Sequence, residues 1–401
     1  MPANKPPFDG EWVRLKGRVE YVRGVTYKAA VDLHEELDRG SYILLRANNI
    51  QDGRLSFDDV QYVDKSKVKP KQLLRKGDIL ICASSGSKSL VGKAALVEND
   101  MPITFGAFCC ALRPKTGESE YLGHYFQSRQ YRKAIERACS GSNINNLKAA
   151  SFESLIVPLY SKTDMLSVVG VLDALVAQKR EAESQLELLD TLVKSRFVEM
   201  FGDPAENTMN WDLIGLASLG SCKNGMNFKS KESGIELPCL GVGDFKDRSF
   251  INGVSEMGRV HLDAMPAEGY FLKDGDIVFV RSNGNKKLVG RCLAVFPNGE
   301  KAVYSGFCIR LRVESDRVRI PYLIWALRHP SMRRQLFGRG ANVQNLNQKL
   351  MAKVKIPAPP LSEQDRFLTF VAEVDKSRFT IQQKIEKLQT LYDSLAQEYF
   401  G

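Results

Sequence analysis

Two short loops in this 401-residue chain combine the side chain types that contact nucleic acids. Residues 84–89 read SSGSKS, and residues 281–287 read RSNGNKK. Glycine allows close backbone approach, hydroxyl and amide groups form hydrogen bonds, and Lys and Arg contact phosphates. A solvated hairpin tip has a similar composition, so one loop alone is ambiguous. The candidate contacts are Ser84, Ser85, Ser87, Lys88, Arg281, Ser282, Asn283, Asn285, Lys286 and Lys287.

Further candidates lie in polar turns. Residues 140–146 (SGSNINN) and 338–345 (GRGANVQN) offer Asn and Gln, which can bind adenine through two hydrogen bonds. Capping of a local turn explains these residues almost equally well. A second pair of polar turns follows short apolar segments at residues 43–53 and 238–248. The candidates from all four turns are Ser142, Asn143, Asn145, Arg339, Asn342, Gln344 and Asn345, with Arg46, Asn48, Asn49, Asp244 and Lys246.

The two basic loops occupy equivalent places in an internal repeat. Residues 76–97 align without a gap to residues 274–295, and each copy has a Gly-Asp turn, an apolar segment, the loop and a Leu-Val-Gly. This pattern predicts a hairpin whose second strand opens at Leu-Val-Gly, with Asp78 and Asp276 as turn residues. The recurrence of the loop in both copies favours a role in binding over a solvated tip.

The repeat continues through the rest of both segments. FCCALR at residues 108–113 matches FCIRLR at 307–312, and helix-like stretches at 121–136 and 322–337 both carry Arg clusters. Strands and helices are mixed without strict β-α-β alternation, so we expect two tandem α+β domains, at residues 1–160 and 203–360.

Long amphipathic helices are predicted at residues 161–202 and 361–401. Apolar residues recur at three- and four-residue steps, which places them on one stripe. Ser161 with Asp164, and Ser362 with Asp365, have capping-box spacing, while Gly202 is a stop signal. Each helix would span roughly 55 Å and needs a partner for its stripe, so we expect the two to pair as a coiled coil. The predicted interface residues are Leu172, Leu175, Leu186, Leu189, Val193, Val374, Ile381, Ile385, Leu388 and Leu395.

The net charge of +10 is concentrated in the predicted domains. Residues 1–160 hold 24 Lys and Arg against 18 Asp and Glu, and residues 203–360 hold 23 against 15. Each helical segment holds 5 against 7. An anionic partner would therefore bind the domains, and nucleic acid is the natural candidate, although a generic basic surface would give the same balance.

Several other classes of site find no support. The four His residues are far apart with no metal-binding spacing, and the Lys93-Ala94 pair lacks the hydroxyl of a phosphate-binding loop. No methyltransferase or nuclease motif stands out, so we expect neither catalytic residues nor a metal or cofactor in this chain. The eight Cys include no C-x-x-C pair, which favours buried free thiols. No uncharged apolar run reaches membrane-spanning length, residues 1–10 resemble a loose tail, and a cytoplasmic protein without a membrane partner is expected.

The order of domain, long helix, domain, long helix resembles the specificity (S) subunit of type I restriction-modification systems. The resemblance covers nearly the whole chain from about Trp12, and its most specific elements are the Pro-Pro-Leu-Ser-Glu-Gln junction at residues 359–364 and the Gly-Asp-Ile and Leu-Val-Gly units. The first junction, VPLYSKTD at residues 157–164, lacks the Pro-Pro and Glu-Gln elements.

The resemblance implies a non-enzymatic reader of double-stranded DNA. Each domain would be a target-recognition domain for one half of a split, asymmetric site. The helices would pair antiparallel, set the gap between half-sites and dock two methyltransferase (M) subunits. Those subunits would bind S-adenosylmethionine and methylate adenine, and restriction (R) subunits would join for cleavage. A DNA-modifying enzyme with unrecognised motifs, or a protein scaffold that binds no DNA, are the alternatives.

Overall fold

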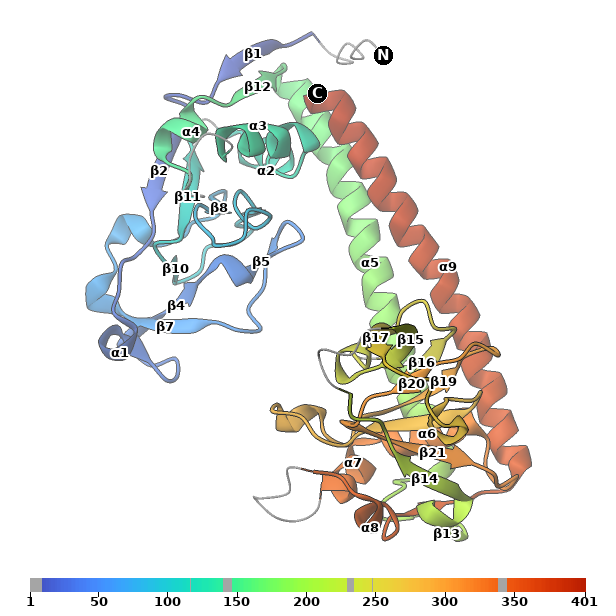
Figure 1. Ribbon diagram of the computed structural model, residues 1–401. Helices are drawn as coiled ribbons and strands as arrows, with labels where there is room; N and C mark the ends of the chain where they lie inside the picture. The colour runs from blue at the N-terminus through green and yellow to red at the C-terminus, as the bar shows by residue number, and fades with distance from the viewer. Residues whose placement is uncertain (1–8, 116, 140–145, 229–233, 247, 338–344) are drawn as a thin grey trace. The chain divides into compact units, whose positions relative to one another are not determined.

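The computed structural model describes residues 9–115, 117–139, 146–228, 234–246, 248–337 and 345–401 (Figure 1). It divides into two compact units. Unit 1 consists of Met1–Ser184 and Ile381–Gly401, and unit 2 consists of Gln185–Thr380. The two long helices, α5 (Lys162–Phe201) and α9 (Leu361–Phe400), are each divided between the units. Every unit therefore holds one globular domain and one part of each long helix.

The globular domain of unit 1 is built on two four-stranded sheets. The first has the order β2 (Val19–Arg23), β11 (Cys109–Pro114), β8 (Ile79–Cys82), β9 (Ala94–Leu96). The second has the order β10 (Ile103–Phe105), β4 (Ser41–Leu45), β7 (Gln61–Asp64), β3 (Leu33–His34). The remaining elements are β1 (Glu11–Arg14) paired with β12 (Ile156–Leu159), β5 (Ile50–Gln51) paired with β6 (Arg54–Leu55), and the helices α1 (Ala29–Asp32), α2 (Ser119–Tyr125), α3 (Arg129–Cys139) and α4 (Ala149–Glu153).

The globular domain of unit 2 repeats this plan. Its larger sheet has the order β14 (Gly220–Asn224), β21 (Cys308–Val313), β18 (Asp276–Val280), β19 (Cys292–Phe296), β16 (Phe250–Asn252). Its smaller sheet has the order β17 (Gly258–Leu262), β15 (Ile235–Leu240), β20 (Val303–Tyr304). β13 (Leu213–Gly215) pairs with β22 (Lys355–Pro357), and the helices are α6 (Ile320–Arg328), α7 (Pro330–Phe337) and α8 (Gln348–Met351). The predicted α+β class and the internal repeat are confirmed.

The strand registers match between the two domains. Cys109 of β11 lies opposite Cys82 of β8, and Cys308 of β21 lies opposite Val280 of β18. The predicted hairpins are therefore present, as antiparallel β8–β9 and β18–β19 pairs. Their second strands begin two residues after Leu-Val-Gly, because Gly92 and Gly290 take positive φ values of 84° and 74° that end a turn.

Each of the two predicted Arg-rich helices is broken into two. In unit 1 the break falls between α2 and α3, where the hydroxyl oxygen of Ser128 accepts a hydrogen bond from the Tyr131 amide at 3.2 Å and starts a new helix. In unit 2 the break falls at His329, directly before Pro330, which lacks the amide hydrogen that would continue the helix. The apolar pattern alone did not reveal either break.

The first long helix begins and ends as predicted, whereas the second begins differently. The Asp164 amide donates to the Ser161 hydroxyl at 3.1 Å, and Gly202 has a φ of 70° after the last residue of α5. The second predicted capping box is wrong. Helix α9 starts at Leu361, so Ser362 lies inside its first turn, and Asp365 instead binds the Arg319 guanidinium at 2.8 Å.

The two long helices pack together within each unit, in opposite directions (Figure 1). In unit 1 the first part of α5 shares a core cluster with the last part of α9, which includes Leu172, Leu388 and Phe400. In unit 2 the last part of α5 shares a cluster with the first part of α9, which includes Phe197 and Phe367. Both clusters also contain side chains of the globular domains, so each stripe is covered by the other helix and by a domain.

Seven of the ten predicted helix-interface residues pack in these two core clusters, and the other three are Leu186, Ile381 and Ile385. Of the ten, five are buried, and these are Leu172, Leu175, Val193, Val374 and Leu388. Five are half-buried, and these are Leu186, Leu189, Ile381, Ile385 and Leu395. The buried side chains among them therefore contribute to the chain's own packing.

Two other expectations concern thiols and membranes. The seven cysteines whose side chains are described are free thiols, and all except Cys222 are buried, which confirms the expectation for them. None of the helices in the described ranges is long and apolar enough to cross a membrane.

Candidate nucleic-acid interface

A buried ion pair fixes the strand that leads into each basic loop. The Arg113 guanidinium donates two hydrogen bonds of 2.8 Å to the Asp78 carboxylate, which is 1 % exposed. Arg312 and Asp276 form the same pair at 2.9 and 2.7 Å. The hydrogen bonds to these carboxylates raise the pKa of both guanidinium groups. Each Asp also accepts a backbone hydrogen bond within its turn, so it is the turn residue that was predicted and an ion-pair partner as well.

The start of each basic loop is joined to the last residue of an Asn-containing polar turn, although the sequence did not predict that these segments meet. Ser84 forms a β-bridge with Asn146, and the Leu147 amide donates to the Ala83 carbonyl oxygen at 2.8 Å. In unit 2, Ser282 forms a bridge with Asn345, and the Leu346 amide donates to the Arg281 carbonyl oxygen at 2.8 Å. Two segments about 60 residues apart in sequence therefore meet at one place in each domain.

The tips of the basic loops are exposed. In the first loop Ser87 and Lys88 are exposed, while Ser84 and Ser85 are half-buried. In the second loop Asn285 and Lys287 are exposed, and Arg281, Ser282 and Asn283 are half-buried. The side-chain oxygens of Asn283 and Asn285 accept hydrogen bonds from the backbone amides of Asn285 and Lys287 at 2.8 and 3.0 Å, which shape the loop. The side chain of Lys286 lies outside the described part of the structure.

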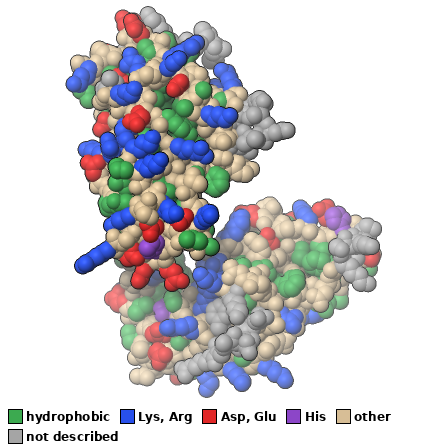
Figure 2. All heavy atoms as spheres, turned by 90° about the vertical axis from the view of Figure 1, so that its left-hand side faces the viewer, with side chains coloured by type: hydrophobic (Ala, Val, Ile, Leu, Met, Phe, Trp, Pro, Cys, Tyr) green, Lys and Arg blue, Asp and Glu red, His purple; other side chains and the backbone are tan. Residues whose placement is uncertain are grey.

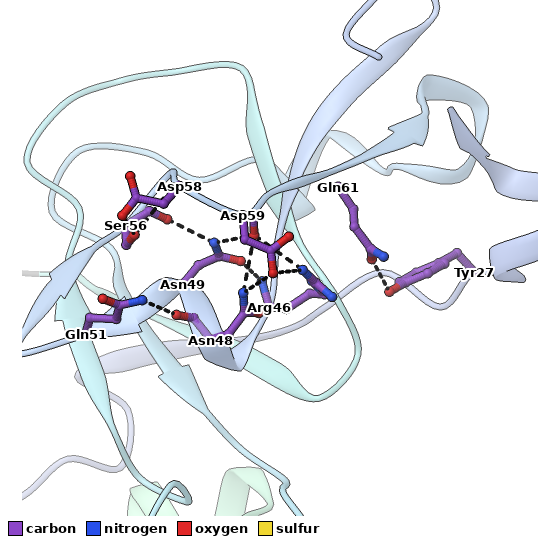
Figure 3. A network of polar contacts seen from close by, with 9 residues as sticks. All are labelled: Tyr27, Arg46, Asn48, Asn49, Gln51, Ser56, Asp58, Asp59 and Gln61. Atoms are coloured by element: carbon purple, nitrogen blue, oxygen red, sulfur yellow. Dashed lines mark hydrogen bonds and ion pairs between the residues drawn. The ribbon is translucent and has the colours of Figure 1, made fainter. Parts of the chain in front are cut away.

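A third predicted segment, in unit 1, is organised around Asp59 (Figure 3). The side chains of Arg46 and Asn48 donate to the Asp59 carboxylate at 2.9 and 3.1 Å. Asn49 is 1 % exposed, its amide group donates to the backbone oxygens of Ser56 and Asp59, and its side-chain oxygen accepts from the Arg46 amide. Asn49 therefore holds the turn together and has no surface left for DNA, whereas Arg46 and Asn48 lie nearer the surface.

The equivalent turn in unit 2 uses a carboxylate for the same purpose. Asp244 accepts a hydrogen bond from the Gly241 amide at 2.7 Å, as Asn49 does from the Arg46 amide. Lys246 follows it with an exposed side chain. Asp244 is thus a turn-forming residue, and Lys246 is the member of this pair that is available to a partner.

Six predicted contacts lie outside the described residues, and these are Ser142, Asn143, Asn145, Arg339, Asn342 and Gln344.

Sequence reasoning missed one further element, the turn that precedes β11 and β21. In unit 1 the Gly106 amide donates to the Leu45 carbonyl oxygen at 2.9 Å, and the Phe108 carbonyl oxygen accepts from the Ala83 and Ser84 amides at 2.9 and 3.0 Å. This turn therefore connects the segment before Arg46 with the start of the basic loop. The signal that could have found it is the Phe that opens both aligned strands, FCCALR and FCIRLR.

The surface charge is basic but mixed. Figure 2 shows Lys and Arg side chains spread over the face that it presents, with Asp and Glu side chains between them. Among the described residues, no group of three or more His, Cys, Asp or Glu side chains is placed to hold a metal ion. Long-range charge thus favours an anionic partner in general, and the loops have to supply any sequence preference.

Comparisons with known proteins agree with this arrangement. The sequence model of the family "Type I restriction modification DNA specificity domain" matches residues 9–183 and 210–390, once for each half of the chain. The specificity subunit of the type I restriction enzyme StySPI from Salmonella potsdam is 32% identical over 397 residues, covering 94% of this chain and 84% of that protein. The EcoKI specificity subunit from Escherichia coli K12 is 30% identical over 425 residues, covering 99% and 89%.

The fold has a solved counterpart. A chain from the structural study "Structural basis underlying complex assembly and conformational transition of the type I R-M system" superposes with a TM-score of 0.60 at 17% identity, covering 98% of both chains. With a family match to each half and two relatives matched over most of their length, this chain belongs to the DNA specificity subunits of type I restriction-modification systems, the non-catalytic recognition components of those enzymes.

Proposed function

We propose that each globular domain reads one half of a bipartite, asymmetric DNA site. The observation that carries this proposal is the matched frame in the two units. In both, a basic loop begins beside an Asn-containing turn, and a buried Arg–Asp pair fixes the strand in front of it. The frames are alike, but the loops they hold differ, SSGSKS in unit 1 and RSNGNKK in unit 2. Two similar supports with different contact residues would read two different half-sites.

The contacts in this proposal come from side chains at the surface of the described loops. Lys88, Lys287 and Lys246 contact phosphates, and Asn285 and the serines of the first loop contact base edges. Net positive charge in both domains attracts the duplex before these contacts form.

The helices form the second part of the proposal. They set the gap between half-sites and dock two M subunits, which methylate adenine with S-adenosylmethionine, while R subunits join for cleavage in the cytoplasm. Since the stripe residues are covered within the chain, docking uses the outer apolar side chains. On α5 these include Leu166, Leu188 and Leu192, which are 63 %, 64 % and 47 % exposed. On α9 they include Phe379 and Leu391, which are 65 % and 47 % exposed. Exposed apolar side chains grouped on one element are typical of interaction surfaces.

Methylome sequencing tests the proposal directly. The chain is expressed with its M subunits in a host that lacks other adenine methylation, and the modified positions are mapped. The expected result is a single bipartite motif with a fixed gap. Exchanging residues 9–160 for the domain of a relative with a different site should change one half of the motif and leave the other half unchanged. If the chain were a protein scaffold that binds no DNA, the domain exchange would leave both halves of the methylated motif unchanged. That result would contradict the proposal.

A further inference from the structure

Two phenylalanine rings at equivalent positions of the repeat are exposed to solvent. Phe108 is 71 % exposed and Phe307 is 61 % exposed, although each directly precedes a strand whose first four residues are buried. Burying a Phe ring in a core is strongly favourable, and leaving it in water forgoes that gain. The fold therefore derives little packing stability from either ring.

The same backbone hydrogen bonds hold both turns in place. In unit 2 the Ser305 amide donates to the Leu240 carbonyl oxygen at 3.0 Å, and the Phe307 carbonyl oxygen accepts from the Arg281 and Ser282 amides at 2.7 and 3.3 Å. These bonds match those of the Gly106–Phe108 turn in unit 1 one for one. A further bond closes each turn, from Cys109 to Gly106 and from Cys308 to Ser305, both at 2.8 Å. Each ring therefore projects from a turn whose backbone is hydrogen-bonded in the same way in both domains.

Each turn that carries a ring is bonded to two segments that are, or directly precede, candidates for DNA contact. Through its backbone, the Phe108 turn joins Leu45, which precedes Arg46, to Ser84, which opens the basic loop. The Phe307 turn joins Leu240, which precedes the Asp244 and Lys246 turn, to Ser282 in the same way. A duplex that contacts both flanking segments has to cover the turn between them, and it would remove the ring from water.

We propose that Phe108 and Phe307 are apolar base contacts, one for each half-site. Resting on the proposed DNA-reading function, this inference assigns to both rings a van der Waals contact with base edges in the groove. Side chains of this type discriminate the methyl group of thymine from polar edges. Apolar contacts release no counterions, so the rings should contribute to the affinity for the cognate sequence and not to its salt dependence.

The test uses the complex of the full chain with its M subunits, and three duplexes. One carries the cognate bipartite site found by methylome sequencing, and each of the others has one half-site scrambled. Phe108→Ala should weaken binding to the cognate duplex about tenfold. It should not weaken binding to the duplex whose domain 1 half-site is already scrambled. Phe307→Ala should give the reciprocal pattern, so each variant is the matched control for the other.

Conservative variants and salt titrations distinguish an apolar base contact from a structural role of the rings. Phe108→Leu and Phe307→Leu, which stay apolar, should retain most of the affinity, and the slope of log affinity against log salt should stay at its wild-type value in all four variants. An equal loss on all three duplexes, no loss on any, or loss of M-subunit binding in size-exclusion chromatography would overturn the proposal. If the wild-type complex itself failed to prefer the cognate duplex, the result would contradict the proposed DNA-reading function on which the role of the rings rests.

Discussion

The side-chain amide of Gln364 donates a 3.0 Å hydrogen bond to the backbone carbonyl oxygen of Arg317 and thereby ties the start of helix α9 to the second globular domain. Gln364 is fully buried, donates also to the Pro359 carbonyl oxygen at 2.8 Å, and accepts from the Arg319 amide at 2.8 Å. The Gln of the Pro-Pro-Leu-Ser-Glu-Gln junction thus has a physical role. Its side-chain amide donates to two backbone carbonyl oxygens and accepts from one backbone amide at the same time.

Removing this amide should destabilise unit 2. Gln364→Ala removes the side-chain partner of three backbone groups and leaves a cavity at a fully buried position, which should lower the free energy of unfolding by about 2 to 3 kcal/mol. Gln364→Glu should cost more, because a buried carboxylate would face two carbonyl oxygens. Chemical denaturation followed by circular dichroism measures both. Thr163 occupies the equivalent place in α5 and is exposed, so Thr163→Ala is the control and should change stability little. Equal effects at both positions would contradict the role assigned to Gln364.

The repeated Arg–Asp pair should be equally important in both domains. Asp78→Asn removes the buried carboxylate that binds Arg113 and leaves only the more distant Glu20 carboxylate, 3.9 Å away, so the expected loss is about 3 kcal/mol of unfolding free energy. Asp276→Asn should cost a similar amount because Arg312 binds Asp276 through the same two hydrogen bonds. Thermal denaturation of the two single variants provides the measurement. A large loss for one variant and none for the other would show that the two domains are not supported in the same way.

The covered stripe of the helix pair can be tested at two neighbouring leucines. Leu388 is 9 % exposed and belongs to the core cluster of unit 1, whereas Leu391 is 47 % exposed. Leu388→Ala should lower the unfolding free energy by about 2 to 4 kcal/mol, since it opens a cavity between α5, α9 and the first domain. Leu391→Ala should stay within about 0.5 kcal/mol of the wild type. Urea denaturation distinguishes them, and indistinguishable midpoints would mean that the stripe is not packed as described.

Phosphate contacts by the basic loops predict a defined change in salt dependence. In the complex with M subunits, Lys88→Ala and Lys287→Ala should each reduce the slope of log affinity against log salt by about one unit. They should weaken binding to cognate and non-cognate duplexes alike. Lys376→Ala is the control, because this helix lysine pairs with Glu373 and is not in a loop. An unchanged slope in both loop variants would show that these lysines do not contact phosphates.

The sequence predicted the features that follow from local pattern. The long helices, the start of α5 at Ser161 and the stop at Gly202 follow from apolar spacing and end signals. The hairpins follow from the aligned copies. Other features depend on the whole fold and left no such signal. Ser362 looked like a cap, but Pro360 supplies the carbonyl oxygen that accepts from the first turn of α9. Asn49 was predicted to contact a base. Its side chain is instead buried, and its amide donates to the backbone oxygen of Asp59, ten residues further along the chain.

The division of each long helix between the two units could not be predicted from the sequence either. Similar stripes on α5 and α9 indicate that the helices pair, but they do not say which part of each helix belongs to which domain. That choice depends on contacts such as the one between Tyr392 of α9 and His124 of α2, whose ring nitrogen and hydroxyl lie 2.9 Å apart. In the second domain Trp325 occupies the aligned position of His124, so the two copies share no residue type from which this contact could be predicted.

If the paired helices set the gap between two half-sites, lengthening both helices should lengthen the gap. Four helix-forming residues are inserted in α5 after Ser184 and four in α9 after Thr380, the positions at which the two compact units divide. Four residues nearly preserve the 3.6-residue period, so each stripe stays covered. An insertion in α5 alone is the control, and the mismatch it creates should reduce methylation.

Methylome sequencing of a host that carries the doubly lengthened chain with its M subunits measures the gap itself. One extra turn adds about 5.4 Å, which corresponds to between one and two base pairs at about 3.4 Å each. The expected result is methylation of the same two half-sites with a gap longer by one or two base pairs. The same half-sites with an unchanged gap, or new half-site bases at the original spacing, would contradict a spacing role for the helices.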